Sequence, residues 1–295
     1  MCESAYQLRA SMYVPCDHPK LTATLKGERF PGIRSLVACT EDAVSLARLD
    51  YALEQLADTL RRMPERGEGP RRFIRCRRPD VLEQILDMEG IERVDGFVLP
   101  KAEISRLCEY EALLTGLDFQ VMPILETCGV FDPGWRAEMR DHLSGSSLRV
   151  LALRIGGNDL LRLLGMRRTR GITIYETPLG VLIPQLMLEF RPSGFHLTAP
   201  VYDYFEDLET LAREVMQDAA YGLVGKTAIH PMQAPVIEKG WALSAEDVEV
   251  ARQILEGRDN QAAVFASNGA MHEVLVHDEW AEAVLQRARS AGSGQ

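Results

Sequence analysis

The sequence predicts an α/β protein, a single (β/α)8 TIM barrel with a short C-terminal helical extension. Short apolar, β-branched runs alternate with helical patterns along most of the 295 residues, which is typical of parallel βαβ units. Eight such runs can be counted, and eight parallel strands with intervening helices close naturally into a barrel. No GxGxxG turn follows the first run, which weakens the alternative of an open doubly wound sheet.

The expected strands and helices follow each other in order. The first long helix shows apolar residues at three-and-four spacing, among them Leu46, Leu49, Leu53 and Leu60. Strands are expected at 11–14, 35–39, 72–76, 96–99, 120–125, 149–155, 195–199 and 222–229. Helices are expected at 44–63, 80–88, 103–115, 178–190 and 208–220, and later a helix at 245–255, a short piece at 263–270 and a final helix near 279–289.

This pattern shows no internal repeat, so we expect one catalytic barrel domain over residues 1–231. Residues 232–295 form the helical extension, which we expect at a subunit interface. The net charge of −10 argues against a nucleic-acid partner. The six cysteines form no CxxC pair, and no signal peptide or membrane-spanning run is present. A cytoplasmic enzyme with a small-molecule substrate and no membrane partner is expected.

Charged residues follow six of the expected strands. In this fold the active site lies at the carboxyl ends of the strands, so such residues are candidate site residues. Four acids at one rim would repel one another unless positive charge lay between them, which suggests a bound cation. The candidates are Glu41 and Asp42, Arg75, Lys101, Glu126, Asp159 and His230.

The best pair of metal ligands is Glu126 with Asp159, because neighbouring strands would bring both carboxylates to one ion. Two hard oxygen ligands suit Mg²⁺ and leave positions for water and substrate oxygens. The structural alternative is helix capping, which is about as good an explanation for Asp159 but a weaker one for Glu126. Asp42 has the same ambiguity, since it could cap the helix expected from residue 44.

Arg75 is the candidate substrate clamp, because a guanidinium can hold a carboxylate in a bidentate fork. Its neighbours Arg71, Arg72, Arg77 and Arg78 are expected to form a solvated fringe. The GKT at Lys226 is not the end of a phosphate loop, since Ala220 replaces the required glycine and a strand follows. Gly156 and Gly157 form a weak phosphate-loop candidate, or they simply allow close backbone approach.

Six motifs in order resemble the citrate lyase beta subunit-like enzymes, of the HpcH/HpaI aldolase superfamily with the malyl-CoA and citramalyl-CoA lyases. The segment at Tyr13 is similar to the family's FVPG, that at Glu41 to LEDAV, and that at Lys101 to VLPK. The segment at Glu126 is similar to IET and that at Asp159 to GAEDL. The last motif, GKTAIHP at residues 225–231, resembles GKWAIHP.

The resemblance implies a homotrimeric or hexameric TIM-barrel lyase with Mg²⁺ on Glu126 and Asp159. It implies that Arg75 grips an α-keto acid, and Lys101, Lys226 and His230 become candidate substrate-binding residues. The chemistry would be retro-aldol or Claisen-type cleavage of a hydroxy-dicarboxylic acid or its CoA thioester. A thioesterase or synthase at the same enolate site is the alternative, and a non-catalytic subunit of a larger assembly is the rival from another class.

Several departures from the family pattern fall on the substrate side. Cys16 replaces the FVPG glycine, Cys39 the first acid of DLEDAV, and Asn158 the glutamate of GAED. In many relatives a C-terminal MID supplies an acid across a subunit boundary, and here that segment reads Met271-His272-Glu273. Glu273 is therefore a candidate proton donor, together with Glu41 and Asp42 as candidate catalytic residues in supporting roles.

Overall fold

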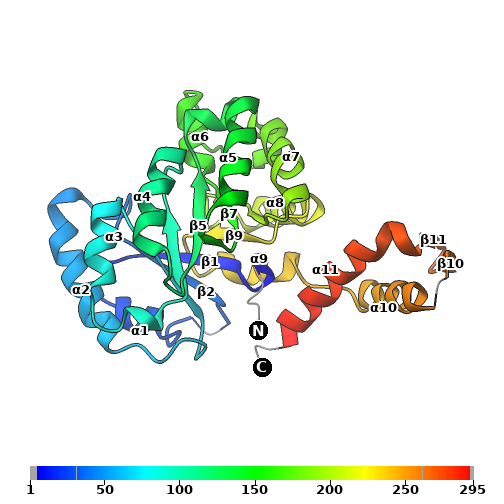
Figure 1. Ribbon diagram of the computed structural model, residues 1–295, viewed down its shortest axis with the longest axis horizontal. Helices are drawn as coiled ribbons and strands as arrows, with labels where there is room; N and C mark the ends of the chain where they lie inside the picture. Colours follow the sequence, from blue (N-terminus) through cyan, green and yellow to red (C-terminus); the bar gives the residue numbers. More distant parts are fainter. Residues whose placement is uncertain (1–4, 31, 261, 293–295) are drawn as a thin grey trace. The chain divides into compact units, whose positions relative to one another are not determined.

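The strands of the barrel appear in the computed structural model where the apolar runs predict them (Figure 1). The structure describes residues 5–30, 32–260 and 262–292. The expected strand at 149–155 is split into two short strands, β6 and β7. The strands are β1 Arg9–Pro15, β2 Ser35–Cys39, β3 Arg71–Arg75, β4 Gly96–Leu99, β5 Gln120–Leu125, β6 Arg149–Val150, β7 Leu153–Ile155, β8 Leu197–Thr198 and β9 Gly225–Ala228.

All of these strands pair in parallel and form a nearly closed ring. Their order is β8-β7-β5-β4-β3-β2-β1-β9, with β6 paired to β5. A parallel bridge between Ala199 and Lys226 joins the two ends of this order, and the amide of Val224 donates to the carbonyl of Leu197 at 2.9 Å. The predicted fold class is therefore confirmed.

The helices up to Gly240 lie outside the ring of strands (Figure 1). Helix α2 shows why: its buried residues include Ala52, Leu53, Leu56 and Leu60, the apolar stripe seen in the sequence. Helices α1, α5 and α9 were not among the expected ones. The helices are α1 Leu21–Leu25, α2 Leu49–Arg61, α3 Pro79–Leu86, α4 Ile104–Leu114, α5 Pro133–Gly145, α6 Gly157–Leu163, α7 Leu179–Phe190, α8 Leu208–Ala220 and α9 Gln233–Gly240.

The register of the strands brings the candidate residues to one rim. Cys39 lies beside Arg75, and Leu125 lies beside Ile155. Because parallel strands all run in one direction, the residues that follow β2, β3, β4, β5 and β7 gather at the carboxyl end of the ring.

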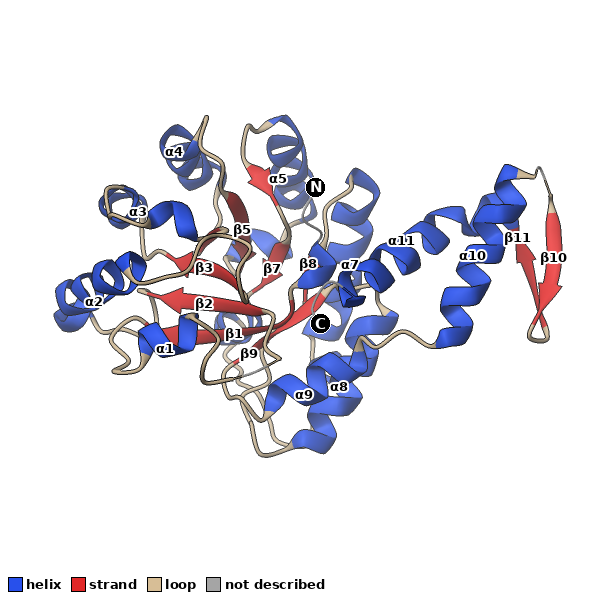
Figure 2. Ribbon diagram, turned by 90° about the horizontal axis from the view of Figure 1, so that it is seen from below, coloured by secondary structure: helices blue, strands red, loops and turns tan. Residues whose placement is uncertain are grey.

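The remaining residues, 5–7 and 241–292, form a second compact unit. Helices α10 Ala245–Asp259 and α11 Val274–Gly292 pack through Val250, Ile254 and Val284. The piece expected at 263–270 belongs to an antiparallel hairpin, β10 Val264–Ser267 and β11 Ala270–Glu273 (Figure 2). Helix α9 packs on α8 and β1, so the division between the units falls after Gly240. In the described part of the chain, every helix is too short or too polar to span a membrane.

Candidate active site

Three predicted site residues from three different strand ends meet at Glu41, directly after β2. Its carboxylate forms an ion pair with Arg75 Nη2 at 2.5 Å and accepts a hydrogen bond from Lys101 Nζ at 2.8 Å. The Glu41 side chain is buried, and burial alone would raise its pKa. The attraction of Arg75 and hydrogen bonds from Asp42 and Lys101 outweigh burial and lower the pKa of Glu41 to about 2. Glu41 is therefore a fixed anion that positions two cations.

Arg75 is held on several sides. Its Nη2 also lies 3.0 Å from Asp42 Oδ2, and its Nε donates to Cys39 Sγ at 3.3 Å. The guanidinium carbon lies 5.5 Å from the centroid of the Tyr13 ring. The hypothesis that Asp42 caps a helix is wrong, because α2 begins only at Leu49 and Asp42 pairs with Arg75 instead.

Lys101 connects the Glu41 network to Glu126. Its Nζ pairs with Glu41, while its backbone N–H donates to Glu126 Oε1 at 2.7 Å. Lys101 adopts a left-handed conformation with φ of 50°, which is uncommon for a residue with a side chain. This strained conformation directs the Lys101 backbone amide at the Glu126 carboxylate. Strained backbone is often found at functional sites.

Glu126 is a buried carboxylate with an acid beside it. Burial raises its pKa, Asp159 raises it further, and the hydrogen bond from the Lys101 amide only partly offsets them, so the pKa is about 7. Within the described residues no ion pair reaches Glu126, whereas Asp159 lies 3.2 Å from the exposed Arg162. Two neighbouring carboxylates, of which the buried Glu126 has no ion-pair partner among the described residues, fit the oxygen ligand set of Mg²⁺.

Asp159 lies inside the first turn of α6 and does not cap that helix. The N-cap is Gly156, and its position carries no side-chain cap hydrogen bond. A β-carbon built on Gly156 would lie 2.4 Å from Glu126 Cβ and 2.6 Å from Glu126 Oε2. Glycine at this position therefore allows the backbone before α6 to approach the Glu126 carboxylate, and the close-approach interpretation of the two glycines fits.

Lys226 is a correction to the predicted substrate-binding set. Its side chain is completely buried, and its Nζ lies 2.7 Å from Glu214 and 2.9 Å from Asp218 on α8. Side chains alternate across a strand, and on β9 Lys226 faces the outer helix while Thr227 faces the interior and reaches Arg154. Lys226 supports the packing of α8 and does not face the rim.

Two other predicted residues have contacts of their own. His230 follows β9 and stacks on Phe205 with ring centroids 4.4 Å apart. Glu273 is exposed at the end of β11 in the second unit, where its backbone N–H donates to His277 Nδ1 at 3.2 Å. The roles predicted for both residues stay predictions.

The prediction of a solvated arginine fringe is wrong for Arg72 and Arg77. Arg72 is buried and donates to the carbonyls of Pro64, Glu65 and Glu68. Arg77 donates to the Glu41 carbonyl at 2.8 Å and so fixes the loop after β2. A charged side chain on a strand can donate to backbone carbonyls in the protein interior. The composition of the segment does not show whether such carbonyls lie nearby.

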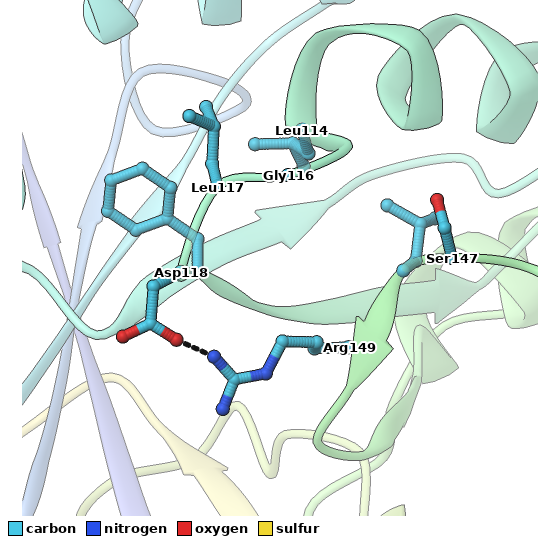
Figure 3. Close-up of a pocket in the computed structure, with 8 residues that line it drawn as sticks. Leu114, Gly116, Leu117, Asp118, Ser147 and Arg149 are labelled. Carbon is cyan, nitrogen blue, oxygen red and sulfur yellow. Dashed lines mark ion pairs between the residues drawn. The ribbon is translucent and has the colours of Figure 1, made fainter.

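A surface pocket, shown in Figure 3, lies near the amino ends of β5 and β6. Its lining includes Leu117, Asp118 and Arg149, which come before or at the start of β5 and β6. Asp118 and Arg149 form an ion pair across it (Figure 3). Because the amino ends of the strands carry stability rather than chemistry in this fold, this pocket is separate from the candidate active site.

The structure thus brings five predicted residues together at one rim of the barrel: Glu41, Arg75, Lys101, Glu126 and Asp159. Residues 2–293 match the family described as "C-C_Bond_Lyase of the TIM-Barrel fold". The chain belongs to this family.

Curated relatives of this carbon-carbon bond lyase family member include enzymes of thioester chemistry. The chain is 27% identical over 261 residues to a (3S)-malyl-CoA thioesterase of Cereibacter sphaeroides, with 86% of this chain and 84% of that protein covered. It is 24% identical over 273 residues to citrate lyase subunit beta of Haemophilus influenzae, covering 87% and 89%. The predicted family is confirmed.

A solved structure supports the fold of this lyase-family chain. CitE of Mycobacterium tuberculosis, in complex with magnesium, acetoacetate and coenzyme A, matches with a TM-score of 0.69 at 24% identity. The match covers 96% of this chain and 99% of that one.

Sequence reasoning missed two residues of this lyase-family site. Tyr13 and Arg154 both point into the barrel interior, where the Arg154 guanidinium carbon lies 5.4 Å from the Tyr13 ring centroid. An arginine inside the apolar run LALRI was the signal for Arg154. Tyr13 carried no comparable signal, because an aromatic residue is ordinary in a strand.

Proposed function

We propose that this protein is a Mg²⁺-dependent lyase that cleaves a carbon-carbon bond in a hydroxy-dicarboxylic acid or its CoA thioester and releases a keto acid. The observation that carries the proposal is the buried carboxylate of Glu126 beside Asp159, with no cation of its own among the described residues. The family assignment fixes the reaction class, and the site supplies the groups that this class of reaction needs.

Glu126 and Asp159 would hold the magnesium ion. When bound, Mg²⁺ supplies a Lewis acid that stabilises negative charge on substrate oxygens. The malyl-CoA and CoA-bound relatives support a thioester substrate.

Arg75 would hold the keto-acid half of the substrate. Its guanidinium is fixed by Glu41 and Asp42, so little conformational freedom is lost on binding. Lys101 adds a second positive charge at the Glu41 carboxylate. Both cations would stabilise negative charge that develops on oxygen during cleavage.

The reaction would run as a retro-Claisen cleavage. The 3-hydroxyl group gives its proton to a carboxylate of the rim, and its oxygen becomes the keto-acid carbonyl. The electron pair of the broken carbon-carbon bond forms a thioester enolate. A proton added to the enolate carbon completes the acyl thioester product. We propose Glu273 of another copy of this chain as the proton donor.

The assembly would then be a homotrimer or hexamer in the cytoplasm. Support comes from exposed apolar side chains in the unit of residues 241–292, among them Met271, Leu275 and Val276. The five described cysteines are all free thiols, as is usual in a reducing compartment.

Product analysis with malyl-CoA, citramalyl-CoA and citryl-CoA tests the proposal. We expect keto acid and a shortened acyl-CoA to form in equal amounts and only with Mg²⁺. Glu126→Gln should reduce this rate at least about 100-fold, the scale expected when a group that stabilises transition-state charge is lost. Glu138→Gln, at an exposed site on α5, is the matched control and should be fully active.

A thioesterase is the second candidate, because the Cereibacter sphaeroides relative carries that name. Free CoA with an intact hydroxy acid would identify hydrolysis without carbon-carbon cleavage. That product pattern, or full lyase activity in Glu126→Gln, would contradict the lyase proposal.

A further inference from the structure

Arg154 is a buried cation in the middle of the barrel. Its side chain is 2% exposed, and it lies on β7 between Leu153 and Ile155. In the strand register Arg154 lies beside Ile124 of β5. Ile124 comes two residues before Glu126 in the chain. Because residues two apart on a strand share a face, Arg154 lies on the same inner face as Gly156, one layer below the carboxylate rim.

The contacts of Arg154 are all neutral. One Nη donates to Thr227 Oγ1 at 2.7 Å, the other lies 3.6 Å from Met122 Sδ, and the guanidinium lies over Tyr13. No carboxylate of the described residues pairs with it. Burial lowers the pKa of Arg154, and Arg75 lowers it further, yet a guanidinium keeps its proton in proteins. A buried charge without a counter-ion is costly to the folded protein.

The other buried arginines show what a structural role requires. Arg168 pairs with Glu214, and Arg9 pairs with Glu238. Arg72 donates to three backbone carbonyls, and Arg136 donates to the Val130 carbonyl and to Gln185 Oε1. In the described ranges, Arg154 alone among them has only neutral hydroxyl groups as oxygen partners, those of Thr227 and Tyr13.

Arg154 also belongs to the same interior space as Arg75. The two guanidinium carbons lie 5.4 and 5.5 Å from the ring centroid of Tyr13. The charge of Arg75 is matched by Glu41 and Asp42, whereas that of Arg154 is not. The interior below the rim therefore holds one guanidinium, that of Arg154, that no carboxylate of the described residues contacts.

We propose that Arg154, with the Thr227 hydroxyl and Tyr13, binds a second carboxylate of the keto-acid half of the substrate. This inference rests on the proposed function and narrows its substrate class to compounds that release a keto diacid rather than a keto monoacid. Arg154 is then the residue that sets specificity, through a charge-assisted bidentate pair with the added carboxylate.

Calorimetric binding in Mg²⁺ buffer tests the proposal without turnover. Two pairs of ligands each differ by one carboxylate: fresh oxaloacetate against pyruvate, and 2-oxoglutarate against 2-oxobutyrate. The wild type should bind the diacid of at least one pair about tenfold or more tightly than its monoacid, a modest gain for a charge-assisted contact. Arg154→Met should bind both members of that pair equally, with the monoacid affinity unchanged.

Two further variants make the result decisive. Arg154→Lys keeps the positive charge but lacks the bidentate guanidinium, so it should retain only part of the preference for the diacid. If Arg154→Met does not fold, Arg154→Lys alone carries the test. Arg167→Met, at an exposed arginine, is the control and should keep the full preference. No preference in the wild type, or an unchanged preference in folded Arg154 variants, overturns the assignment. Lyase activity is measured separately, so a preference without any cleavage would refute only the lyase proposal.

Discussion

At the scale of single residues, Glu41 organises the rim through a buried ion-pair network. A carboxylate whose folded pKa lies near 2, below its ordinary value of 4.5, stabilises the fold above pH 4.5 and loses that contribution as the pH falls toward 2. The shift from 4.5 to about 2 corresponds to about 3 kcal/mol when the group is fully ionised in both states.

This shift predicts how the stability of a Glu41→Gln variant depends on pH. The wild type should exceed the variant in unfolding free energy at pH 6, and about 2 kcal/mol of that advantage should be lost by pH 3, since only the unfolded state takes up the proton. Urea unfolding at both pH values measures it. The exposed Glu54→Gln serves as control, and an advantage of Glu41 that does not change with pH would contradict the pairing.

Lys226 gives a second residue-scale prediction. Lys226→Met removes one cation from a buried cluster and leaves Glu214 and Asp218 short of positive charge, which should cost about 3–5 kcal/mol. Thermal unfolding should show a large fall in Tm, while Mg²⁺ affinity of the folded fraction stays the same. An unchanged Tm with weaker substrate binding would restore the original interpretation.

The residues of the rim differ in how well sequence alone could place them. Glu41 and Lys101 follow apolar runs and Arg75 ends one, so the barrel rule brings them to one end of the barrel. There the structure pairs Arg75 and Lys101 with Glu41. Lys226 lies within a strand, where alternate side chains face the barrel interior or the outer helices. A shift of one residue therefore decides whether the Lys226 side chain faces the site or helix α8. Arg154 was missed because the pairing of a buried charge depends on strands far apart in sequence.

At the scale of elements, the turn from β7 to α6 shapes the proposed metal site. Gly156→Ala would drive a methyl group into Glu126, and we expect Mg²⁺ affinity to fall about 10–100-fold, as for changes that misorient a ligand. Gly145→Ala, at the end of α5 with open space around it, is the matched control. Equal Mg²⁺ affinity in both variants would show that the approach is not needed.

The eight strands were predicted with near-correct bounds because polar or glycine residues mark both ends of each apolar run. The hairpin β10–β11 was not, although Asn268 and Gly269 both have positive φ at its turn, and Asn-Gly is a strong hairpin signal. Short helices such as α1 were missed because five residues give too little periodicity.

At the scale of the whole molecule, assembly depends in this account on the unit of residues 241–292. Leu275 is 76% exposed and Val276 68% on α11. Leu275→Glu should shift the molecular mass measured by light scattering from oligomer toward monomer, because a charge would be buried unpaired at the interface.

Leu188→Glu, on α7 and 77% exposed, is the matched control for the assembly test. It should leave the oligomer intact. A monomeric wild type, or equal dissociation of the two variants, would contradict the assignment of the interface to residues 241–292.

The most direct test is calorimetric titration of Mg²⁺ into the wild type, Glu126→Gln and Asp159→Asn. We expect one ion per chain in the wild type and about 100-fold or greater loss of affinity in each variant, since each removes one of the two proposed charged ligands. A wild type that binds no Mg²⁺, or two variants that bind it as tightly as the wild type, would contradict a metal site at Glu126 and Asp159.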